Sequence, residues 1–456
     1  MFVQTALVAL LITAESVLTL DNGVGATPAM GWNSWTSRGC RVSERDVRKA
    51  VEYLSESGLT SLGYDHVVID DCWQLTRDSN GQIHEDGRAF PSGMKALVRY
   101  GLKVGLYSSA GTFTCQGRPG SLSFETKDAK TYASWGVDYL KYDNCNNDGL
   151  SDRKGTIKRY GAMRDALNAT GRHINYAISN WGQADVWEYG DTLGNSWRTS
   201  EDVEDSWQSV IDTIKVNALL SKFAKPGAFN DMDVLQVGNG GMTYEEYRTQ
   251  FTLWAILKSP LFLSQKIQSS FGDTINPGAY EMVSNPDIIA INQDKLGMPA
   301  ILRASLDSVL LWVGELNHGE RILVVLNTGS RSVDVDVSLS AFTVKEEDAI
   351  ASQKWRVSVR DLWARKVTGT AKSKIKVAGV APHSVKAYKV SLKGPDVVFP
   401  SLATASPFHD HPIQYSETGT VALVMWSLFF SLIFIGVAWA LYKLHLERRA
   451  GYEVLR

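Results

Sequence analysis

The feature that most constrains this chain is a regular alternation of strand-like and helix-like segments from about residue 26 to residue 295. Short runs rich in Val, Ile, Tyr, Phe and Leu predict buried strands, and longer runs with apolar residues at helical spacing predict helices between them. The strand-like runs are TPAMGWNSW, HVVID, KVGLYSS, DYLKYD, HINYAIS, NSWRTS, GAFNDMD and PLFLSQ. This α/β pattern predicts a (β/α)₈ TIM barrel, which we assign to residues 17–298, with a doubly wound open sheet as the alternative.

Two of the predicted helices carry start signals. Ser43 and Asp46 have the spacing of a capping box before one of them, and Thr243 and Glu246 have it before another. Downstream of the alternating region, short β-rich runs separated by turn residues predict a small antiparallel β-sandwich over residues 301–392. Residues 393–420 contain Pro, Ser and His without periodicity, and we interpret them as a stalk.

Both ends of the chain carry apolar segments. Residues 1–16 have the length of a signal peptide and end in small and polar residues. Residues 421–441 form an uncharged run long enough to cross a bilayer as one transmembrane helix. Because Lys443, Arg448 and Arg449 follow directly, residues 442–456 are predicted to be a cytoplasmic tail. The sequence thus predicts the secretory pathway and a single-pass type I membrane protein whose catalytic part is lumenal or extracellular.

The charge balance and the missing motifs exclude several function classes. Lys plus Arg is 47 and Asp plus Glu is 49, which gives a formal net charge of −2 and argues against a nucleic-acid partner. The sequence has no GxxxxGK[ST] phosphate loop, no EF-hand loop, no HExxH zinc motif and no GxSxG nucleophile elbow. We therefore expect no cofactor and no metal. The oligomeric state has no signature in the sequence.

Four cysteines, Cys40, Cys72, Cys115 and Cys145, lie in the part of the chain predicted to be lumenal. An even number in an oxidising compartment favours two disulfides, for which three pairings are possible. A zinc site is the alternative, but no CxxC spacing or close Cys/His pairing supports it. Asn168 begins the tripeptide NAT, which is an N-glycosylation acceptor pattern.

Carboxylates recur where the predicted strands end. They are Asp70, Asp71, Asp143, Asp231 and Asp233, with Asp202, Glu204 and Asp205 just after the sixth strand. In a barrel these ends meet at one lip, where barrel enzymes keep their chemistry. A single acid of this kind can be a cap or a loop anchor, and clustered acids can also bind Mg²⁺ or Ca²⁺. Glycoside hydrolysis requires a pair of carboxylates across the scissile bond.

Aromatic residues accompany these acids. They are Trp35, Trp73, Tyr107 and Trp181. Aromatic rings cover the C–H faces of sugars, whereas carboxylates accept hydrogen bonds from sugar hydroxyls. Aromatic residues are more often part of a core than of a ligand site, but together with the acids they indicate a sugar pocket.

Several long motifs resemble one family. They are MGWNSW, IDDCWQ, GLKVGLYSSAG, WGVDYLKYDNC, NSWRTSEDVEDSW, NDMDVLQVGNGGMTYEEYRTQFTLWAILKSPLFLS and IIAINQD, in order from about residue 22 to residue 300. This set resembles glycoside hydrolase family 27, the α-galactosidases (melibiases) and α-N-acetylgalactosaminidases. The resemblance implies a (β/α)₈ barrel, a β-rich C-terminal module and a retaining mechanism.

The resemblance also implies roles for individual residues. Asp143 matches the nucleophile that forms a covalent glycosyl-enzyme, and Asp202 matches the general acid/base. The motif register favours Asp202 over its neighbours Glu204 and Asp205. We expect Lys141 to keep Asp143 ionised, and we expect the two catalytic carboxyl groups to lie about 5 to 5.5 Å apart.

Other positions match residues of the family's sugar pocket. Asp70 and Asp71 match the pair that holds the O4 and O6 hydroxyls of galactose. The further matches to the pocket wall are Trp35, Tyr107, Lys141, Arg198 and Asp233. Cys40 with Cys72 and Cys115 with Cys145 match two family disulfides.

One loop departs from the family pattern. Residues 179–183 read SNWGQ, where α-galactosidases of the family often have a Cys at the position of Ser179. Trp181 is expected to crowd a 2-acetamido group and to favour plain galactose, although Ser179 removes part of that argument. We predict a retaining α-galactosidase acting on oligosaccharides or glycoconjugates. The alternatives are an α-N-acetylgalactosaminidase, a β-L-arabinopyranosidase and a catalytically inactive galactoside receptor in the membrane.

Overall fold

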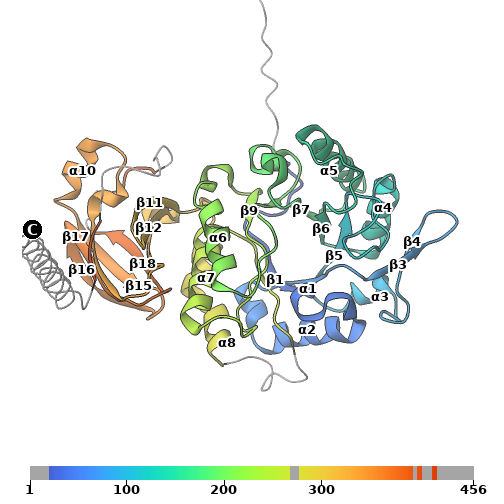
Figure 1. Cartoon of the computed structure of the whole chain (residues 1–456), viewed down its shortest axis with the longest axis horizontal. Helices are drawn as coiled ribbons and strands as arrows, with labels where there is room; N and C mark the ends of the chain where they lie inside the picture. The colour runs from blue at the N-terminus through green and yellow to red at the C-terminus, as the bar shows by residue number, and fades with distance from the viewer. Residues whose placement is uncertain (1–19, 268–276, 394–397, 403–412, 418–456) are drawn as a thin grey trace, which may run out of the picture.

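The computed structural model describes residues 20–267, 277–393, 398–402 and 413–417. The predicted signal peptide at residues 1–16 and the predicted membrane span at residues 421–441 lie outside these ranges. Among the residues that are described, no helix is both long enough and apolar enough to cross a membrane. The chain forms an α/β domain and a β-rich domain that lie side by side (Figure 1).

The α/β domain is built on a TIM-like sheet of eight parallel strands. Its order is β10-β1-β2-β5-β6-β7-β8-β9, so that neighbours in the sheet follow one another along the chain and the last strand lies beside the first. The strands are β1 (Met30–Asn33), β2 (His66–Ile69), β5 (Lys103–Ser109), β6 (Tyr139–Asp143), β7 (Asn175–Ser179), β8 (Ser196–Arg198), β9 (Phe229–Asp231) and β10 (Leu261–Leu263). Every run that the sequence predicts as a strand of the barrel contains one of them.

This strand order excludes the doubly wound alternative, in which the order reverses at a switch point. Beyond β9, Leu235 forms a parallel bridge with Leu263 of β10. The Leu235 amide donates to the carbonyl oxygen of Phe262 at 2.8 Å. The two outer strands of the sheet are therefore connected through the segment that follows β9.

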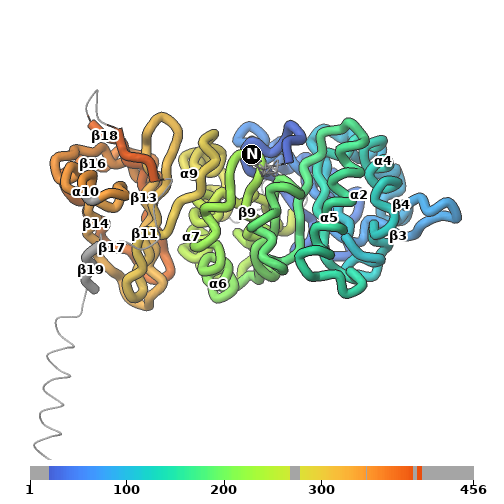
Figure 2. Tube along the Cα trace, turned by 90° about the horizontal axis from the view of Figure 1, so that it is seen from above, coloured from blue at the N-terminus to red at the C-terminus, as the bar shows by residue number. Residues whose placement is uncertain are grey.

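Helices follow the strands on the outside of the sheet. Both predicted capping boxes are present, with Ser43 and Asp46 at the start of α2 (Glu44–Glu56) and Thr243 and Glu246 at the start of α7 (Tyr244–Ile256). The other helices of this domain are α1 (Trp35–Arg38), α3 (Met94–Leu97), α4 (Glu125–Trp135), α5 (Arg153–Asn168), α6 (Trp207–Asn217), α8 (Pro277–Val283) and α9 (Pro286–Asn292). A hairpin of β3 (Gln74–Arg77) and β4 (Ile83–Glu85) projects from the end opposite the β-rich domain (Figure 2).

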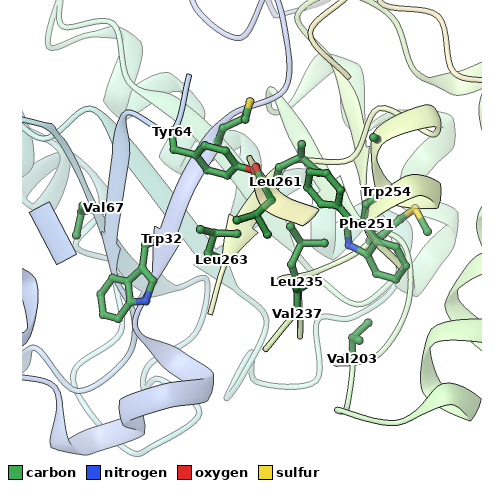
Figure 3. Packing of buried hydrophobic residues seen from close by; sticks show 14 of the residues in the cluster. Trp32, Tyr64, Val67, Val203, Leu235, Val237, Phe251, Trp254, Leu261 and Leu263 are labelled. Atoms are coloured by element: carbon green, nitrogen blue, oxygen red, sulfur yellow. The ribbon is translucent and has the colours of Figure 1, made fainter. Parts of the chain in front are cut away.

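The main core lies between the sheet and these helices. Figure 3 shows Leu235 and Leu263 from the sheet region beside Phe251 and Trp254 of α7, with Trp32 of β1 on the other side of Leu263, and all five are buried. A smaller group fills the inside of the sheet. It consists of Ala29, Val68, Tyr139, Ala177 and Phe262. Apolar burial on both faces of the strands explains why the sequence shows continuous apolar runs rather than alternation.

The β-rich domain is an antiparallel β-sandwich. Its nine strands have the order β11-β12-β13-β18-β15-β16-β17-β14-β19. They are β11 (Ile301–Leu306), β12 (Val309–Glu315), β13 (Arg321–Asn327), β14 (Val333–Ser338), β15 (Arg356–Asp361), β16 (Lys366–Lys372), β17 (Lys374–Val380), β18 (Val385–Leu392) and β19 (Ile413–Glu417), with one helix, α10 (Glu346–Ser352). A second buried cluster fills this domain.

The stalk interpretation of residues 393–420 is wrong in part. Strand β19, at residues 413–417, pairs antiparallel with β14. Phe399 and Leu402 are buried in the core of the sandwich, where Phe399 packs against Phe342 and Trp355. The sequence signal was weak because these short segments are separated by Pro and Ser and show no period of their own.

Helix α7 joins the two domains. His383, in the loop after β17, pairs with Glu246 at 2.7 Å, and its ring stacks on Trp207 with a centroid separation of 4.4 Å. The hydroxyl of Thr249 donates to the carbonyl oxygen of His383 at 2.7 Å. These contacts fix the sandwich against the helical side of the α/β domain.

Candidate active site

The predicted acids gather at the carboxyl ends of the parallel strands. Asp143, Arg198 and Asp231 are the last residues of β6, β8 and β9, and Asp70 directly follows β2. Because these strands are parallel neighbours or close to one another in the sheet, the side chains share one lip. The structure thereby brings together residues that lie far apart in the sequence.

Asp143 is buried, with 6% of its surface exposed. Its Oδ2 accepts a hydrogen bond from the hydroxyl of Tyr107 at 2.8 Å, and its Oδ1 accepts one from the Asn144 amide at 3.1 Å. Burial raises the pKa of Asp143 to about 6, although Lys141 and the Tyr107 hydrogen bond act in the opposite direction. The carboxyl group is therefore oriented by two donors and held away from bulk water.

Lys141 does not bond to Asp143. Its Nζ donates to Oδ2 of Asp70 at 2.9 Å. Burial disfavours the charged ammonium, but Asp70 and Asp143 outweigh that effect and raise the pKa of Lys141. The expectation that Lys141 keeps Asp143 ionised is correct in direction, but burial of Asp143 is the larger effect and moves its pKa upward.

Asp70 and Asp71 are both buried and held by different groups. The Oδ2 of Asp70 accepts from Nδ2 of Asn33 at 2.8 Å as well as from Lys141. Asp71 accepts from the Gln116 amide at 3.0 Å. Sequence reasoning missed Asn33, although it occupies the end of β1 and the strand-end rule that selected the acids also applies to it.

Asp202 lies in the loop after β8, and its side chain is 68% exposed. Arg198 donates to its Oδ1 at 3.1 Å and pairs with Asp233 at 3.3 Å. Partial burial raises the pKa of Asp202, but Arg198 and Lys141 outweigh that effect and lower it. Asp202 is therefore an accessible, ionised carboxylate.

The neighbours of Asp202 have different surroundings. Asp205 accepts hydrogen bonds from the Tyr247 hydroxyl and the Gly241 amide, both at 2.7 Å, so it anchors the loop before α7. Glu204 is exposed on the surface. Of the three acids, Asp202 is the one that pairs with Arg198 at the strand lip.

The predicted aromatic residues separate into two groups. Tyr107 contacts Asp143, and Trp35 is half-buried directly after β1. Trp73 is a core residue, because it is completely buried, packs edge-on against Tyr132 and donates its Nε1 to the backbone of Tyr107. The grouping of Trp73 with the sugar-contacting aromatics is therefore wrong.

Ser179 is the last residue of β7, and Trp181 belongs to the sharply turned segment that follows it. Ser179 is buried, and no partner for its hydroxyl is found among the residues described. Trp181 is half-buried and has a φ of 57°, which is uncommon for a bulky residue. Gln183 accepts a hydrogen bond from Asn144 at 2.9 Å, so the segment is tied to the residue that follows Asp143.

The four cysteines form two disulfides, Cys40–Cys72 and Cys115–Cys145. The Sγ of Cys115 lies 3.3 Å from Oδ2 of Asp143. Although Cys115, Asp143 and Cys145 are close enough to suggest a metal site, both sulfurs are already bonded to each other. Disulfides of this kind persist in oxidising compartments, which supports the secretory pathway.

A cavity of about 20 Å³ lies within the lip and is large enough for about one water molecule. Its polar lining includes Lys141, Ser179, Arg198, Asp231 and Asp233. Sequence reasoning noted Asp231 among the strand-end acids and gave it no role.

Two family models match the chain. The model described as alpha galactosidase A matches residues 27–294, and the model described as alpha galactosidase C-terminal beta sandwich domain matches residues 307–390. Alpha-galactosidase 3 of Arabidopsis thaliana is 43% identical over 357 residues, covering 76% of this chain and 78% of the relative.

Solved structures agree with these matches. The structure of alpha-galactosidase I from Mortierella vinacea has a TM-score of 0.76 and 38% identity, covering 81% of this chain and 98% of that one. The Saccharomyces cerevisiae α-galactosidase with raffinose also has a TM-score of 0.76, with 29% identity, covering 82% of this chain and 99% of that one. With both of its domains matched and an acidic pocket at the strand lip, the chain belongs to the α-galactosidases of glycoside hydrolase family 27.

Proposed function

We propose that this α-galactosidase releases terminal, non-reducing α-D-galactosyl residues with retention of configuration, by double displacement through Asp143 and Asp202. The observation that carries the proposal is the contrast between the two acids. Asp143 is buried and fixed by Tyr107, whereas the Asp202 side chain is 68% exposed. A nucleophile needs a fixed direction of attack, and a general acid/base needs access to the leaving group and to water.

In the first step, a carboxylate oxygen of Asp143 attacks the anomeric carbon and forms the galactosyl-enzyme. The bond to the leaving oxygen breaks, and Asp202 transfers its proton to that oxygen. In the second step, Asp202 takes a proton from water, which attacks the anomeric carbon and releases galactose and the Asp143 carboxylate. This mechanism expects the two carboxyl groups about 5 to 5.5 Å apart when galactose is bound.

The remaining acids and bases form the proposed galactose pocket. Asp70, which contacts Lys141 and Asn33, and its neighbour Asp71 are assigned as the pair that holds the O4 and O6 hydroxyls of galactose. Charged hydrogen bonds to sugar hydroxyls are strong and directional, so the axial O4 of galactose is favoured over the equatorial O4 of glucose. The other proposed wall residues are Trp35, Tyr107, Ser179, Trp181, Arg198 and Asp233.

The protonation states that the two pKa values favour differ from those that the reaction requires. Burial raises the pKa of Asp143 to about 6, whereas Arg198 outweighs burial and lowers the pKa of Asp202. The reaction requires the opposite order, with Asp143 ionised and Asp202 protonated. A bound galactoside covers the exposed Asp202, and removal of this carboxyl from water raises its pKa. Substrate binding therefore favours the protonated form of Asp202 that the first step requires.

We expect an acid limb in the pH profile of kcat/KM. Burial favours the neutral form of Asp143, so the nucleophile is active above about pH 6 and is lost as the pH falls through about 6. Below this point kcat/KM on nitrophenyl α-galactoside should fall about tenfold per pH unit. Tyr107→Phe removes a hydrogen bond that lowers the pKa and should move the limb to higher pH. A limb that stays below about pH 4.5 would show that Asp143 titrates like an exposed aspartate.

The substrate class can be tested with a panel of nitrophenyl glycosides. The yeast enzyme solved with raffinose supports α-galactosyl oligosaccharides as substrates here too. We expect turnover of the α-galactoside and of raffinose. We expect at least about 100-fold lower kcat/KM on the α-N-acetylgalactosaminide, because Trp181 is expected to crowd a 2-acetamido group. Preference for the acetamido sugar or for the β-L-arabinopyranoside would contradict the proposal. Galactose binding without turnover would favour the receptor alternative.

We also propose the domain limits and the membrane anchor. The barrel spans residues 17–298, the sandwich extends from residue 301 to β19, and residues 421–441 form one membrane span with a cytoplasmic tail at 442–456. Asn168, exposed at the end of α5, is the proposed glycosylation site.

The anchor predicts where activity is found. The full-length chain should sediment with membranes and require detergent for release, whereas a chain ending at residue 418 should appear in the medium with unchanged kcat. This expectation follows from the uncharged length of residues 421–441. Recovery of the full-length chain in the medium with its last residues intact would rule out the anchor.

A further inference from the structure

Asp231, the last residue of β9, contacts the acid/base loop through its neighbour Asp233. Its Oδ1 accepts a hydrogen bond from the Asp233 amide at 2.8 Å. Asp233 has a φ of 74°, in the left-handed region that non-glycine residues seldom adopt. The hydrogen bond that the Asp233 amide donates to the Asp231 side chain holds Asp233 in this conformation, because it engages the amide of the left-handed residue directly.

The left-handed conformation directs the Asp233 carboxylate to the loop that carries Asp202. Its Oδ2 accepts from the amide of Val203 at 2.9 Å, and Val203 directly follows Asp202. The same oxygen lies 3.3 Å from Nη2 of Arg198, which also bonds to Asp202. Asp233 therefore positions Asp202 in two ways. It binds the backbone amide of the next residue, Val203, and it pairs with Arg198, which bonds to the Asp202 side chain.

The backbone of Asp231 adds a second link to the same segment. Its carbonyl oxygen accepts from the Thr199 amide at 3.1 Å and from the Thr199 hydroxyl at 3.2 Å. Its carboxyl group lines the cavity of about 20 Å³, together with Arg198 and Asp233. Burial raises the pKa of Asp231 to about 6, while Arg198 lowers it. Oδ1 of Asp231 can accept the hydrogen bond from the Asp233 amide whether the carboxyl group is ionised or protonated. Asp231 can therefore hold Asp233 in place in both protonation states.

We propose that Asp231 is a positioning residue, which sets the place of the acid/base Asp202 through two linked hydrogen bonds. The Asp233 amide donates one to Asp231, and the Val203 amide donates the other to Asp233. The inference rests on the proposed role of Asp202. It assigns the task to the acceptor oxygen of Asp231 and not to its charge, and it requires no contact between Asp231 and the substrate.

A displaced general acid/base has a kinetic signature that a general loss of fold lacks. Substrates with a good leaving group, such as 2,4-dinitrophenyl α-galactoside, need little protonation, whereas a sugar leaving group, as in melibiose, needs full protonation. Azide attacks the galactosyl-enzyme without a general base, so it should restore turnover of the dinitrophenyl substrate and yield galactosyl azide. These two readouts report on Asp202 alone.

The experiment compares Asp231→Ala and Asp231→Asn in the full-length protein. For the alanine variant we expect kcat/KM on melibiose to fall at least about tenfold further than on the dinitrophenyl substrate, with azide rescue of the latter. The asparagine variant keeps an acceptor for the Asp233 amide, so its leaving-group dependence should match the wild type. An asparagine variant that behaves like the alanine variant overturns the proposal, as does a loss of equal size on both substrates without azide rescue.

Two further variants complete the test. Asp202→Ala should show the same leaving-group dependence and azide rescue, with a larger effect. If Asp202→Ala lacks them, the acid/base assignment of Asp202 is wrong. If Asp202→Ala has them and Asp231→Ala lacks them, only the proposal for Asp231 is wrong. Asp205→Asn changes a nearby acid that anchors the loop before α7, and it should change turnover of both substrates equally. If Asp231→Ala is not recovered folded, Asp231→Glu is measured instead. It moves the carboxylate by one methylene, so the proposal expects the same signature from it.

Discussion

Replacement of Asp143 by alanine is expected to reduce kcat on nitrophenyl α-galactoside by at least about 10⁴-fold, because it removes the proposed covalent route. Asp143 ends β6 with a hydrogen bond from Tyr107, and no second carboxylate shares its buried position on that strand. No other carboxylate on β6 can form the covalent intermediate, so residual turnover should be very slow.

Two measurements make this result specific. Galactose binding, followed by titration calorimetry, should survive in Asp143→Ala because Asp70 and Lys141 remain paired. Asp148→Asn, which changes an exposed acid in the loop after the same strand, should keep wild-type kcat. If Asp143→Ala keeps more than about 1% of wild-type kcat in a preparation free of host enzyme, Asp143 is not the nucleophile.

The second large effect is expected at Asp202. Asp202→Ala should lower kcat/KM on melibiose by about 10² to 10⁴-fold, the usual range for loss of a general acid, and should affect the dinitrophenyl galactoside much less. The physical reason is that Asp202 is the accessible acid at the lip, paired with Arg198 at 3.1 Å. The same substrates, measured over a series of leaving-group acidities, should give a steeper dependence in the variant.

Glu204→Gln is the matched control for Asp202, because Glu204 is an exposed acid two positions along the same loop. It should leave the leaving-group dependence unchanged. Should Glu204→Gln instead show the steep dependence and azide rescue, the motif register would have selected the wrong acid.

The sheet was predictable because its signals are local. Each buried strand is a short run of β-branched, aromatic or aliphatic residues, and the helices that follow have caps such as Ser43 with Asp46. Asp143 was predictable for the same reason, since the end of a strand can be located from one run of residues. The eight runs and the parallel connections together left few topologies to consider.

The failures share a different cause, which is contact between residues that are distant in the sequence. Nothing near Lys141 indicates that it bonds to Asp70, and nothing near Trp73 indicates that its ring packs against Tyr132 instead of facing the pocket. The strand β19 was missed because its partner β14 lies far upstream. The link from Asp231 to the acid/base loop depends on the backbone conformation of Asp233, which residue types alone do not specify.

Helix α7 also has a consequence for how independent the two domains are. Its Trp254 donates to the carbonyl oxygen of Asp233 at 2.7 Å, next to the sugar pocket, and its Thr252 accepts from Trp363 of the sandwich at 3.2 Å. The same helix thus braces the catalytic lip on one side and carries the second domain on the other. The sandwich therefore contacts the same helix that bonds to the backbone of Asp233, and the two domains are not independent at this point. Engineering that swaps or deletes the sandwich removes this contact from α7, and we expect it to weaken the support that α7 gives to the backbone of Asp233.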